Sequence, residues 1–297
     1  MRLLDRSHGH QGIHESEGPM IMRAKARVRI LAAVVAAIFL GSAAPQSALA
    51  WGAEGHRVIA EIAEKHLSPA AAARVAALLQ ADGAPSLAAI SVWADDYRVL
   101  HPETGSWHFV DIPVAESRYN AQRDCPGNNC VVAKINEMAG YLRNPSTPLD
   151  GQVMALKYLV HFVGDIHQPL HCADRRDAGG NKLRVKLGKE FTNLHHIWDT
   201  ELIAMAGGHD ASALAADLDA QISGQDVAAW LAKKSVEEWA NETHRVAIYN
   251  AYADLPDSKV AVQIDQAYLD AAEPVALHQL QVAGIRLAST LNAIFGK

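Results

Sequence analysis

The spacing of apolar residues predicts a mostly helical protein. After residue 50, Ala, Leu and other apolar residues recur at intervals of three and four, the period at which side chains share one face of an α-helix. The stretch 153–163 is almost continuously apolar, which predicts a helix buried at the centre of the fold. The expected helices are 53–66, Ser68–Pro69 to about Gln80, Pro85 through Trp93 to Arg98, 153–163, 227–250 and 262–294.

One segment has a different period. Apolar and charged residues alternate from Lys182 to Leu187, Gly188 provides a turn, and 190–194 can return as a second strand, so this segment predicts a small β-hairpin. The sequence contains no internal repeat, low-complexity tract or linker. The pattern therefore predicts an all-α fold, a single multi-helix domain with a minor β-hairpin.

Residues 23–50 have the pattern of a secretory signal peptide. A basic stretch, an apolar stretch too short to span a bilayer comfortably, and a small-x-small cleavage site follow one another. We expect cleavage after Ala50, so that 1–50 is a removed extension and 51–297 is the mature domain; the alternative is a buried helix. Residues 1–19 lack apolar periodicity, which makes Met20 or Met22 an alternative initiator. The three parts are Arg23, Lys25, Arg27 and Arg29; Ile30 to Leu40; and Ala48-Leu49-Ala50.

The charge of the predicted mature chain limits how it can bind polyanions. Of the 297 residues, 51–297 hold 21 Lys and Arg against 30 Asp and Glu, a formal charge of −9. This balance argues against non-specific DNA binding through a basic surface. Attraction to a polyanion then has to come from metal ions and local contacts. No apolar run after residue 50 is long enough for a membrane span, so we expect no stable membrane insertion.

The chain has three cysteines. Cys125 and Cys130 flank the turn-forming sequence Pro-Gly-Asn-Asn, and export permits disulfides, so we expect a local disulfide between them. Cys172 is then left as a free thiol. Because it follows His171, the less favoured alternative is a soft metal ligand.

Histidines and aspartates recur at spacings that suggest a metal site. His161 and Asp165 are four residues apart within an apolar helix, and His195 and Asp199 repeat this spacing, which places each pair on one helix face. One such pair is more often an ordinary hydrogen bond. Two pairs together with His171 favour a cation, because buried carboxylates are costly unless paired or bound to one. Nitrogen and carboxylate donors suit zinc.

Trp51 is a further ligand candidate. Once cleavage has freed its α-amino group, that group and the Trp51 carbonyl can chelate a metal through a five-membered ring, with His56 five residues further on. The alternative, which the residues alone favour, is an ordinary apolar N-terminus.

Motifs along the whole mature chain resemble one known family. The chain resembles the zinc-dependent single-strand-specific nucleases, which include fungal secreted nucleases, mung bean nuclease and plant bifunctional nucleases. The resemblance runs from Trp51 to Phe295 in order and without a missing block. It implies a fold like that of zinc phospholipase C and the zinc nucleases. The motifs are WGAEGHRVIAEIA, WADDYR, WHFVDIP, LKYLVHFVGDIHQPLHCA, GGN, NLHHIWD and AGIRLASTLNAIF.

The resemblance implies three zinc ions in a cleft, with Asp165 shared by two of them. His195 is favoured over its neighbour His196 as the ligand. Carried over by position, the ligand sets are Asp95, His108, His161 and Asp165 for the first ion; His171, His195 and Asp199 for the second; and the Trp51 amino and carbonyl groups, His56 and Asp165 for the third.

The resemblance also implies the reaction: zinc-activated water attacks the phosphorus of single-stranded DNA or RNA and leaves 5′-phosphates, with 3′-nucleotidase activity in addition. Asp95 and Arg98 are the catalytic candidates, since Arg98 can neutralise charge on the phosphate; its alternative role is a surface charge. Phe109 implies base stacking, and Asp111 and Asn181 imply polar contacts to the base. The alternatives are a core aromatic for Phe109 and turn capping for the other two. We expect a monomer that is periplasmic or secreted.

Two rival functions remain. A zinc phospholipase C has a similar fold, a trinuclear site and an N-terminal Trp. The WADDYR motif, Asp199 in NLHHIWD, and Asp111 beside Phe109 favour a nuclease. A non-catalytic periplasmic zinc-binding protein is the second rival, and Arg98 together with the base-pocket residues argues against it.

Overall fold

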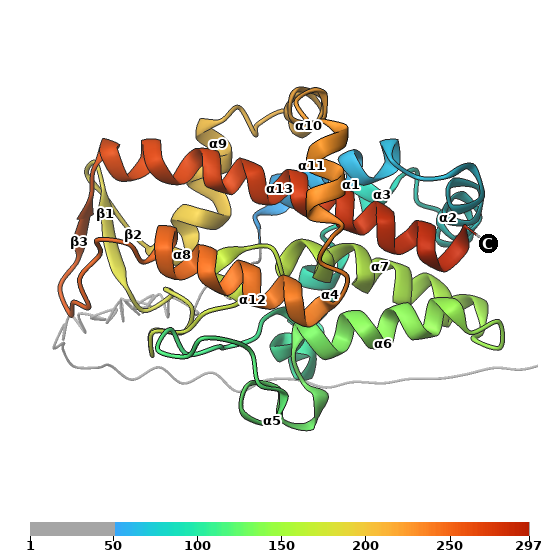
Figure 1. The fold of residues 1–297 in the computed structure, drawn as a ribbon, viewed down its shortest axis with the longest axis horizontal. Helices are drawn as coiled ribbons and strands as arrows, with labels where there is room; N and C mark the ends of the chain where they lie inside the picture. Colours follow the sequence, from blue (N-terminus) through green and yellow to red (C-terminus); the bar gives the residue numbers. More distant parts are fainter. Residues whose placement is uncertain (1–50, 297) are drawn as a thin grey trace, which may run out of the picture. The chain divides into compact units, whose positions relative to one another are not determined.

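The computed structural model describes residues 51–296, which form a helical fold with one small sheet (Figure 1). This confirms the predicted all-α class with a minor β-ribbon. The predicted signal peptide and the rest of 1–50 lie outside the described residues. Within 51–296 no single helix is long and apolar enough to cross a bilayer; the helices Pro69–Asp82 and Leu87–Leu100 meet that criterion only as a pair bent by 49°.

Long helices form the core. Figure 1 shows α13 running along the described part of the chain, with α7 and α6 below it. Helix α1 packs most extensively against α13, and α6 against α7. Gly284 of α13 permits the first contact, because a Cβ there would lie 2.6 Å from Cγ2 of Ile62 in α1. The bounds are α1 (Ala53–Lys65), α6 (Val131–Arg143), α7 (Leu149–Asp165) and α13 (Gln266–Phe295).

The predicted second helix is present as α2 (Pro69–Asp82), and the Ser68 side chain accepts the Ala71 N–H as its cap. The third predicted helix is wrong as a continuous element. It starts after Ser86, not at Pro85, and divides into α3 (Leu87–Ile90) and α4 (Trp93–Leu100). The physical reason lies at Ser91: its hydroxyl donates to Ala88 O, and its carbonyl accepts a hydrogen bond from a distant histidine, described below.

Two further predicted helices need correction. The segment 227–250 is not one helix: α11 (Gly224–Trp230) ends, and Ser235 starts α12 (Val236–Val246) with a reciprocal capping box. A π-helical turn, Ala247–Ala251, follows. The segment 262–294 begins as a strand, and its helix starts only after Asp265, whose side chain accepts the Tyr268 N–H.

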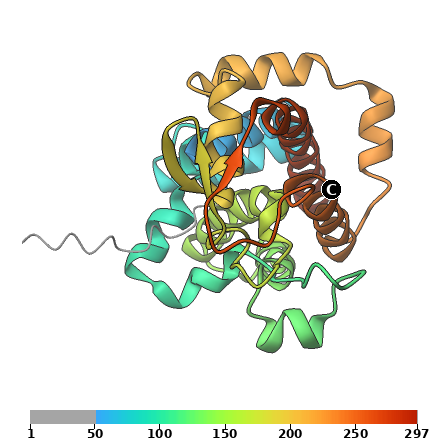
Figure 2. The ribbon, with the colours of Figure 1, turned by 90° about the vertical axis from the view of Figure 1, so that its left-hand side faces the viewer.

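The sheet confirms the hairpin and adds a strand that local spacing did not predict. Strands β1 (Arg184–Leu187) and β2 (Glu190–Asn193) pair antiparallel, and β3 (Val262–Ile264) pairs parallel with β1, in the order β2-β1-β3 (Figure 2). Gly188 turns the hairpin with φ of +59°. Strand β2 leads directly into α8 (Leu194–His196), so the hairpin positions the helix that carries the predicted ligand His195.

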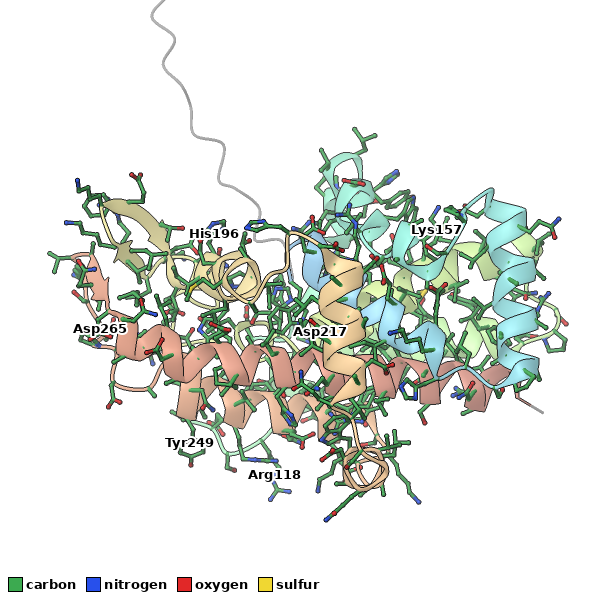
Figure 3. All side chains as sticks on the ribbon, turned by 90° about the horizontal axis from the view of Figure 1, so that it is seen from above. Arg118, Lys157, His196, Asp217, Tyr249 and Asp265 are labelled. Atoms are coloured by element: carbon green, nitrogen blue, oxygen red, sulfur yellow. A yellow bond between two sulfur atoms is a disulfide. The ribbon has the colours of Figure 1, made fainter. Side chains whose placement is uncertain are left out.

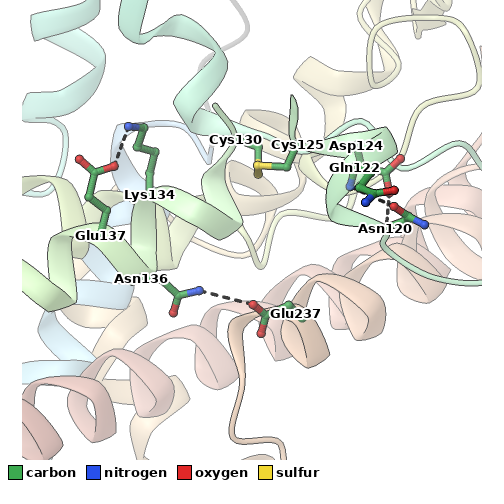
Figure 4. Close-up of a disulfide and its surroundings, with 9 residues drawn as sticks. All are labelled: Asn120, Gln122, Asp124, Cys125, Cys130, Lys134, Asn136, Glu137 and Glu237. Atoms are coloured by element: carbon green, nitrogen blue, oxygen red, sulfur yellow. Dashed lines mark hydrogen bonds and ion pairs between the residues drawn. A yellow bond between two sulfur atoms is a disulfide. The ribbon is translucent and has the colours of Figure 1, made fainter. Parts of the chain in front are cut away.

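Shorter elements connect these helices. The predicted disulfide Cys125–Cys130 is present and joins the end of α5 to the start of α6 (Figure 4). Cys172 is a free, buried thiol that donates to Ile166 O at 3.3 Å. The remaining helices are α5 (Ala121–Asp124), α8 (Leu194–His196), α9 (Leu202–Met205) and α10 (Ala211–Ala220).

Candidate metal centre

Three groups of buried histidines and aspartates bring together all eight side chains that were predicted as ligands. In each group, one donor atom from every member lies within 4.8 Å of the others. The groups come from α1, α4, α7, α8 and the turns beside them, so residues far apart in the sequence meet at one place. They are His56, His161 and Asp165; Asp95, His108 and His161; and His171, His195 and Asp199.

Asp165 lies between two of these groups. Its Oδ1 is 3.3 Å from Nε2 of His56, whereas its Oδ2 is 3.0 Å from Nδ1 of His108 and 3.4 Å from Nε2 of His161. In the group of Asp95, His108 and His161, Oδ1 of Asp95 lies 3.6 Å from Nε2 of His161. The two oxygens of one carboxylate thus face different partners, which is the geometry a bridging ligand needs.

The third group is built on one short helical segment and one turn. His195 lies in α8 and Asp199 in the π-helical turn Ile197–Glu201, and their Nε2 and Oδ2 atoms are 3.2 Å apart. His171 ends the 3₁₀ turn Pro169–His171, and its Nε2 lies 3.1 Å from Nε2 of His195. The four-residue spacing read from the sequence does place His195 and Asp199 together.

Backbone carbonyls fix the orientation of three of the predicted ligand imidazoles. Nδ1 of His161 lies 2.7 Å from Ser91 O, Nδ1 of His171 lies 2.7 Å from His108 O, and Nδ1 of His195 lies 2.6 Å from Gly179 O. A carbonyl only accepts, so each Nδ1 carries the proton and donates it. Each Nε2 is therefore directed into the groups, as in metal sites whose histidines are held from behind.

The imidazoles of His171 and His195 face each other through their Nε2 atoms. Burial lowers the pKa of His171 well below its usual value, and the charge of His195 adds to this effect. When both rings are neutral and each proton is on Nδ1, the two Nε2 lone pairs face each other at 3.1 Å without a proton between them. A metal ion bound by both nitrogens removes this conflict.

Burial disfavours the charged form of most side chains in the three groups. It raises the pKa of Asp165 and of Asp199 well above the usual range and lowers the pKa of His56 and His108. Burial also lowers the pKa of His161, but Asp165 and Asp95 outweigh it and raise that pKa to about 9. Asp165 and Asp95 thus favour a positive charge at His161, whereas burial disfavours one at His56 and His108. Within these groups, the buried atoms without a hydrogen-bond partner are both ring nitrogens of His56, Nε2 of His108, and Oδ1 of Asp95 and Asp165.

Trp51 lies beside the groups and is fully buried. Its Cβ is so close to Gly55 that a Cβ on the glycine would lie 2.9 Å away. The next residue, Gly52, donates its N–H to Asp199 O at 2.8 Å. The backbone at Trp51 is therefore fixed next to the predicted ligands; the metal-binding role of its amino group stays a prediction.

The predicted substrate residues have different surroundings. Nη2 of Arg98 lies 3.2 Å from Oδ1 of Asp95, and both side chains are only 9% exposed, so Arg98 is not a surface charge. Phe109 is 36% exposed, which contradicts the alternative of a core aromatic. Nδ2 of Asn181 donates to Ala178 O at 2.9 Å, which is the turn role considered as its alternative.

Asp111 is an exposed residue. Partial desolvation of its carboxyl group, together with the negative charges of Asp174, Asp177 and Asp124, raises the pKa of Asp111 to about 6. The side chain can therefore change its charge in mildly acidic solution.

The rival ligand His196 turns away from the three groups. Its Nε2 lies 3.2 Å from Glu201, and its side chain is 39% exposed (Figure 3). His167 is buried with Nδ1 2.7 Å from Val163 O and Nε2 3.0 Å from Arg286, so it is a structural residue. Sequence reasoning missed Gln168, which contacts Asp199 directly. The sequence signal that could have identified Gln168 was its position between the predicted ligands Asp165 and His171.

Comparison with known proteins finds relatives that match most of the chain. The profile of the S1/P1 nuclease family matches residues 51–296. The chain is 31% identical to Endonuclease 2 of Arabidopsis thaliana, over 83% of this chain and 91% of that protein. It is 30% identical to Nuclease P1 of Penicillium citrinum (83% and 98%) and 29% identical to Nuclease S1 of Aspergillus oryzae (82% and 91%).

These matches and the helical fold define a nuclease, a hydrolase that acts on phosphodiester bonds of nucleic acid. The chain belongs to the S1/P1 nuclease family.

Proposed function

We propose that this nuclease is an exported, zinc-dependent endonuclease that cleaves single-stranded DNA and RNA to 5′-phosphates and also acts on 3′-nucleotides. The observation that carries the proposal is the convergence of three buried His/Asp groups in which one carboxylate, Asp165, faces two of them.

Three zinc ions suit these groups. The donors are imidazole nitrogens and carboxylate oxygens, which zinc accepts in four-coordinate sites. His171, His195 and Asp199 are three donors and leave one position for water or substrate, and His56 with Asp165 leaves positions for the Trp51 amino and carbonyl groups. The proposed ligands are Asp95, His108, His161 and Asp165; His171, His195 and Asp199; and Trp51, His56 and Asp165.

The residues around the groups have distinct tasks. Bound zinc supplies Lewis acidity and makes water acidic enough to act as a nucleophile near neutral pH. Asp95 holds the guanidinium of Arg98 at 3.2 Å, in a largely buried position where its charge is poorly screened. Arg98 then neutralises the charge that grows on the phosphate during attack.

Phe109 and Asp111 support a preference for single strands. An exposed ring can stack on a base, and a carboxylate two residues away can accept hydrogen bonds from a base edge. A base inside a duplex is stacked and paired, so it cannot reach such a pocket. This favours single-stranded substrates over duplexes.

We propose export because of the predicted signal peptide. The pattern of residues 23–50 supports cleavage after Ala50, which frees the amino group of Trp51 as a ligand. The disulfide Cys125–Cys130 is consistent with an oxidising compartment. We propose a periplasmic or secreted monomer.

One assay set tests the proposal. The protein is expressed with its leader, purified after export, and analysed for N-terminal sequence and metal content. Hydrolysis of single-stranded DNA, RNA, duplex DNA, a 3′-nucleotide and a choline phospholipid is then measured. We expect about three zinc ions per chain, rapid cleavage of both single-stranded substrates, and loss of activity on chelation that zinc restores. Faster cleavage of the phospholipid or the duplex, or full activity without metal, would overturn the proposal.

A further inference from the structure

Gln168 is a fully buried polar residue that touches the third His/Asp group without belonging to it. It lies between α7 and the turn Pro169–His171. Its Nε2 donates to Oδ1 of Asp199, and its Oε1 accepts the backbone N–H of Leu170 at 2.5 Å. One side chain thus contacts residues 2 and 31 positions further along the sequence.

The hydrogen-bond network fixes the orientation of this amide. The Leu170 N–H is a donor, so the atom of Gln168 that faces it has to be the carbonyl oxygen. The amide NH₂ is then directed at Asp199, which accepts when ionised. The reverse orientation would set a donor against the Leu170 N–H and an acceptor against a carboxylate, and it is therefore excluded.

Each half of the amide acts on a different member of the group. The carbonyl caps the turn that carries His171, and the NH₂ holds Oδ1 of Asp199. This leaves Oδ2 of Asp199 facing Nε2 of His195 at 3.2 Å. His195 is fixed separately, by the Gly179 carbonyl. Each of the three residues thus has a hydrogen-bond partner outside the group.

We propose that Gln168 is a positioning residue for the metal held by His171, His195 and Asp199. It restricts Asp199 to one ligand oxygen and keeps His171 in place, so the donors are arranged before the metal binds. The inference rests on the proposed metal-binding role of this group. Partners behind metal ligands typically change metal affinity or activity about 10–100-fold when they are removed.

Two substitutions separate the two halves of the amide. Gln168→Glu keeps an oxygen for the Leu170 N–H, but it replaces the donor to Asp199 with a second carboxylate. Gln168→Met keeps a similar volume and removes both hydrogen bonds. Gln152→Met is the matched control, because Gln152 is also a buried glutamine of this region of the chain but bonds Thr147 O and Arg74.

The test is the rate at which metal leaves the exported, zinc-loaded protein into a chelating dye. We expect one metal equivalent to dissociate about 10–100-fold faster in both Gln168 variants, and the others at the wild-type rate. Excess zinc should restore most of the nuclease activity of Gln168→Met. The Gln152→Met variant should release metal as the wild type does, whatever its melting temperature.

The outcomes distinguish the two levels of the proposal. Wild-type rates of metal release in both Gln168 variants, even with lowered melting temperatures, would show that Gln168 only stabilises the fold and would overturn the positioning role. Wild-type protein that binds no zinc at all would instead overturn the proposed function. A defect in Gln168→Met without one in Gln168→Glu would also refute the role of the hydrogen bond to Asp199.

Discussion

Gly52 donates its backbone N–H to the main-chain carbonyl of Asp199 at 2.8 Å. The side chain of Asp199 belongs to the group with His171 and His195, while Gly52 follows Trp51 directly. The hydrogen bond of Gly52 therefore connects the start of the described chain to the group that contains Asp199. A Cβ on Gly52 would lie 3.0 Å from Asp199 O and 3.2 Å from Oγ1 of Thr200, so a larger residue fits only if these neighbours move by a few tenths of an ångström.

Gly52→Ala should displace the backbone at Trp51. We expect the exported protein to lose about one zinc and roughly 10-fold or more of its activity, because the donors near Trp51 move. Elemental analysis and a nuclease assay measure this. Gly140→Ala in α6 is the control, since open space surrounds Gly140. That control should retain its zinc and gain about 0.4–1 kcal/mol of stability.

An extra residue before Trp51 should have a similar effect for a different reason. The added peptide bond removes the free amine, and an amide nitrogen is a poor ligand without deprotonation. The extended protein should bind one zinc fewer and lose most of its activity, whereas one residue added after Lys297 should change neither. Full activity with the N-terminal extension would disprove the ligand role of Trp51.

Asp165→Asn should be more harmful than Asp199→Asn. The two oxygens of Asp165 face His56 on one side and His108 with His161 on the other, whereas Asp199 serves one group. Zinc content should fall by two in the first variant and by one in the second, with activity losses above the 10–100-fold typical of outer partners. Equal and mild losses would show that Asp165 does not bridge.

The raised pKa of Asp111 predicts a pH-dependent stability. Its folded-state pKa of about 6 lies above the ordinary 3.8, so the folded protein binds this proton more tightly than the unfolded chain. The stabilisation is full at low pH, falls as pH rises from about 4 to about 6, and is absent above that. Asp111→Asn should therefore raise the melting temperature at pH 7 more than at pH 5.

The control for Asp111 is Asp257→Asn, which changes an exposed loop aspartate. Its effect on the melting temperature should be small at both pH values. A constant difference between wild type and Asp111→Asn across this range would mean that neither burial nor the negative charges of Asp174, Asp177 and Asp124 raise the pKa of Asp111 in solution.

Salt should affect substrate binding only weakly. The mature charge of −9 argues against an extended basic track, so the salt dependence of the Michaelis constant for a short single strand should report about one or two phosphate contacts.

Phe109→Ala should raise this Michaelis constant at every salt concentration, because stacking contributes about 1–3 kcal/mol. Arg98→Ala should mainly lower turnover, since its charge acts as the phosphate becomes more negative. A log–log slope of the Michaelis constant against salt concentration that is equivalent to about six or more phosphate contacts would point to a basic surface instead.

The sequence determined the parts of this protein that depend on local geometry. The spacing of His161 and Asp165, and of His195 and Asp199, places each pair together because a helix repeats every 3.6 residues. Alternation around Gly188 fixed the hairpin, and the short separation of Cys125 and Cys130 fixed the disulfide. The motifs in order also identified the family, which the profile match confirms.

The tertiary structure decided what depends on residues far apart in the chain. The helix break at Ser91 provides a carbonyl for His161, 70 residues away, and β3 forms only because β1 lies beside it. Gln168 contacts Asp199 across 31 positions of sequence, and Gly52 contacts it across a much longer stretch. A local pattern specifies which side chains share a face. It cannot specify which buried donor meets which buried acceptor, because those pairings form only when the packed helices exclude water and leave each polar group a single partner.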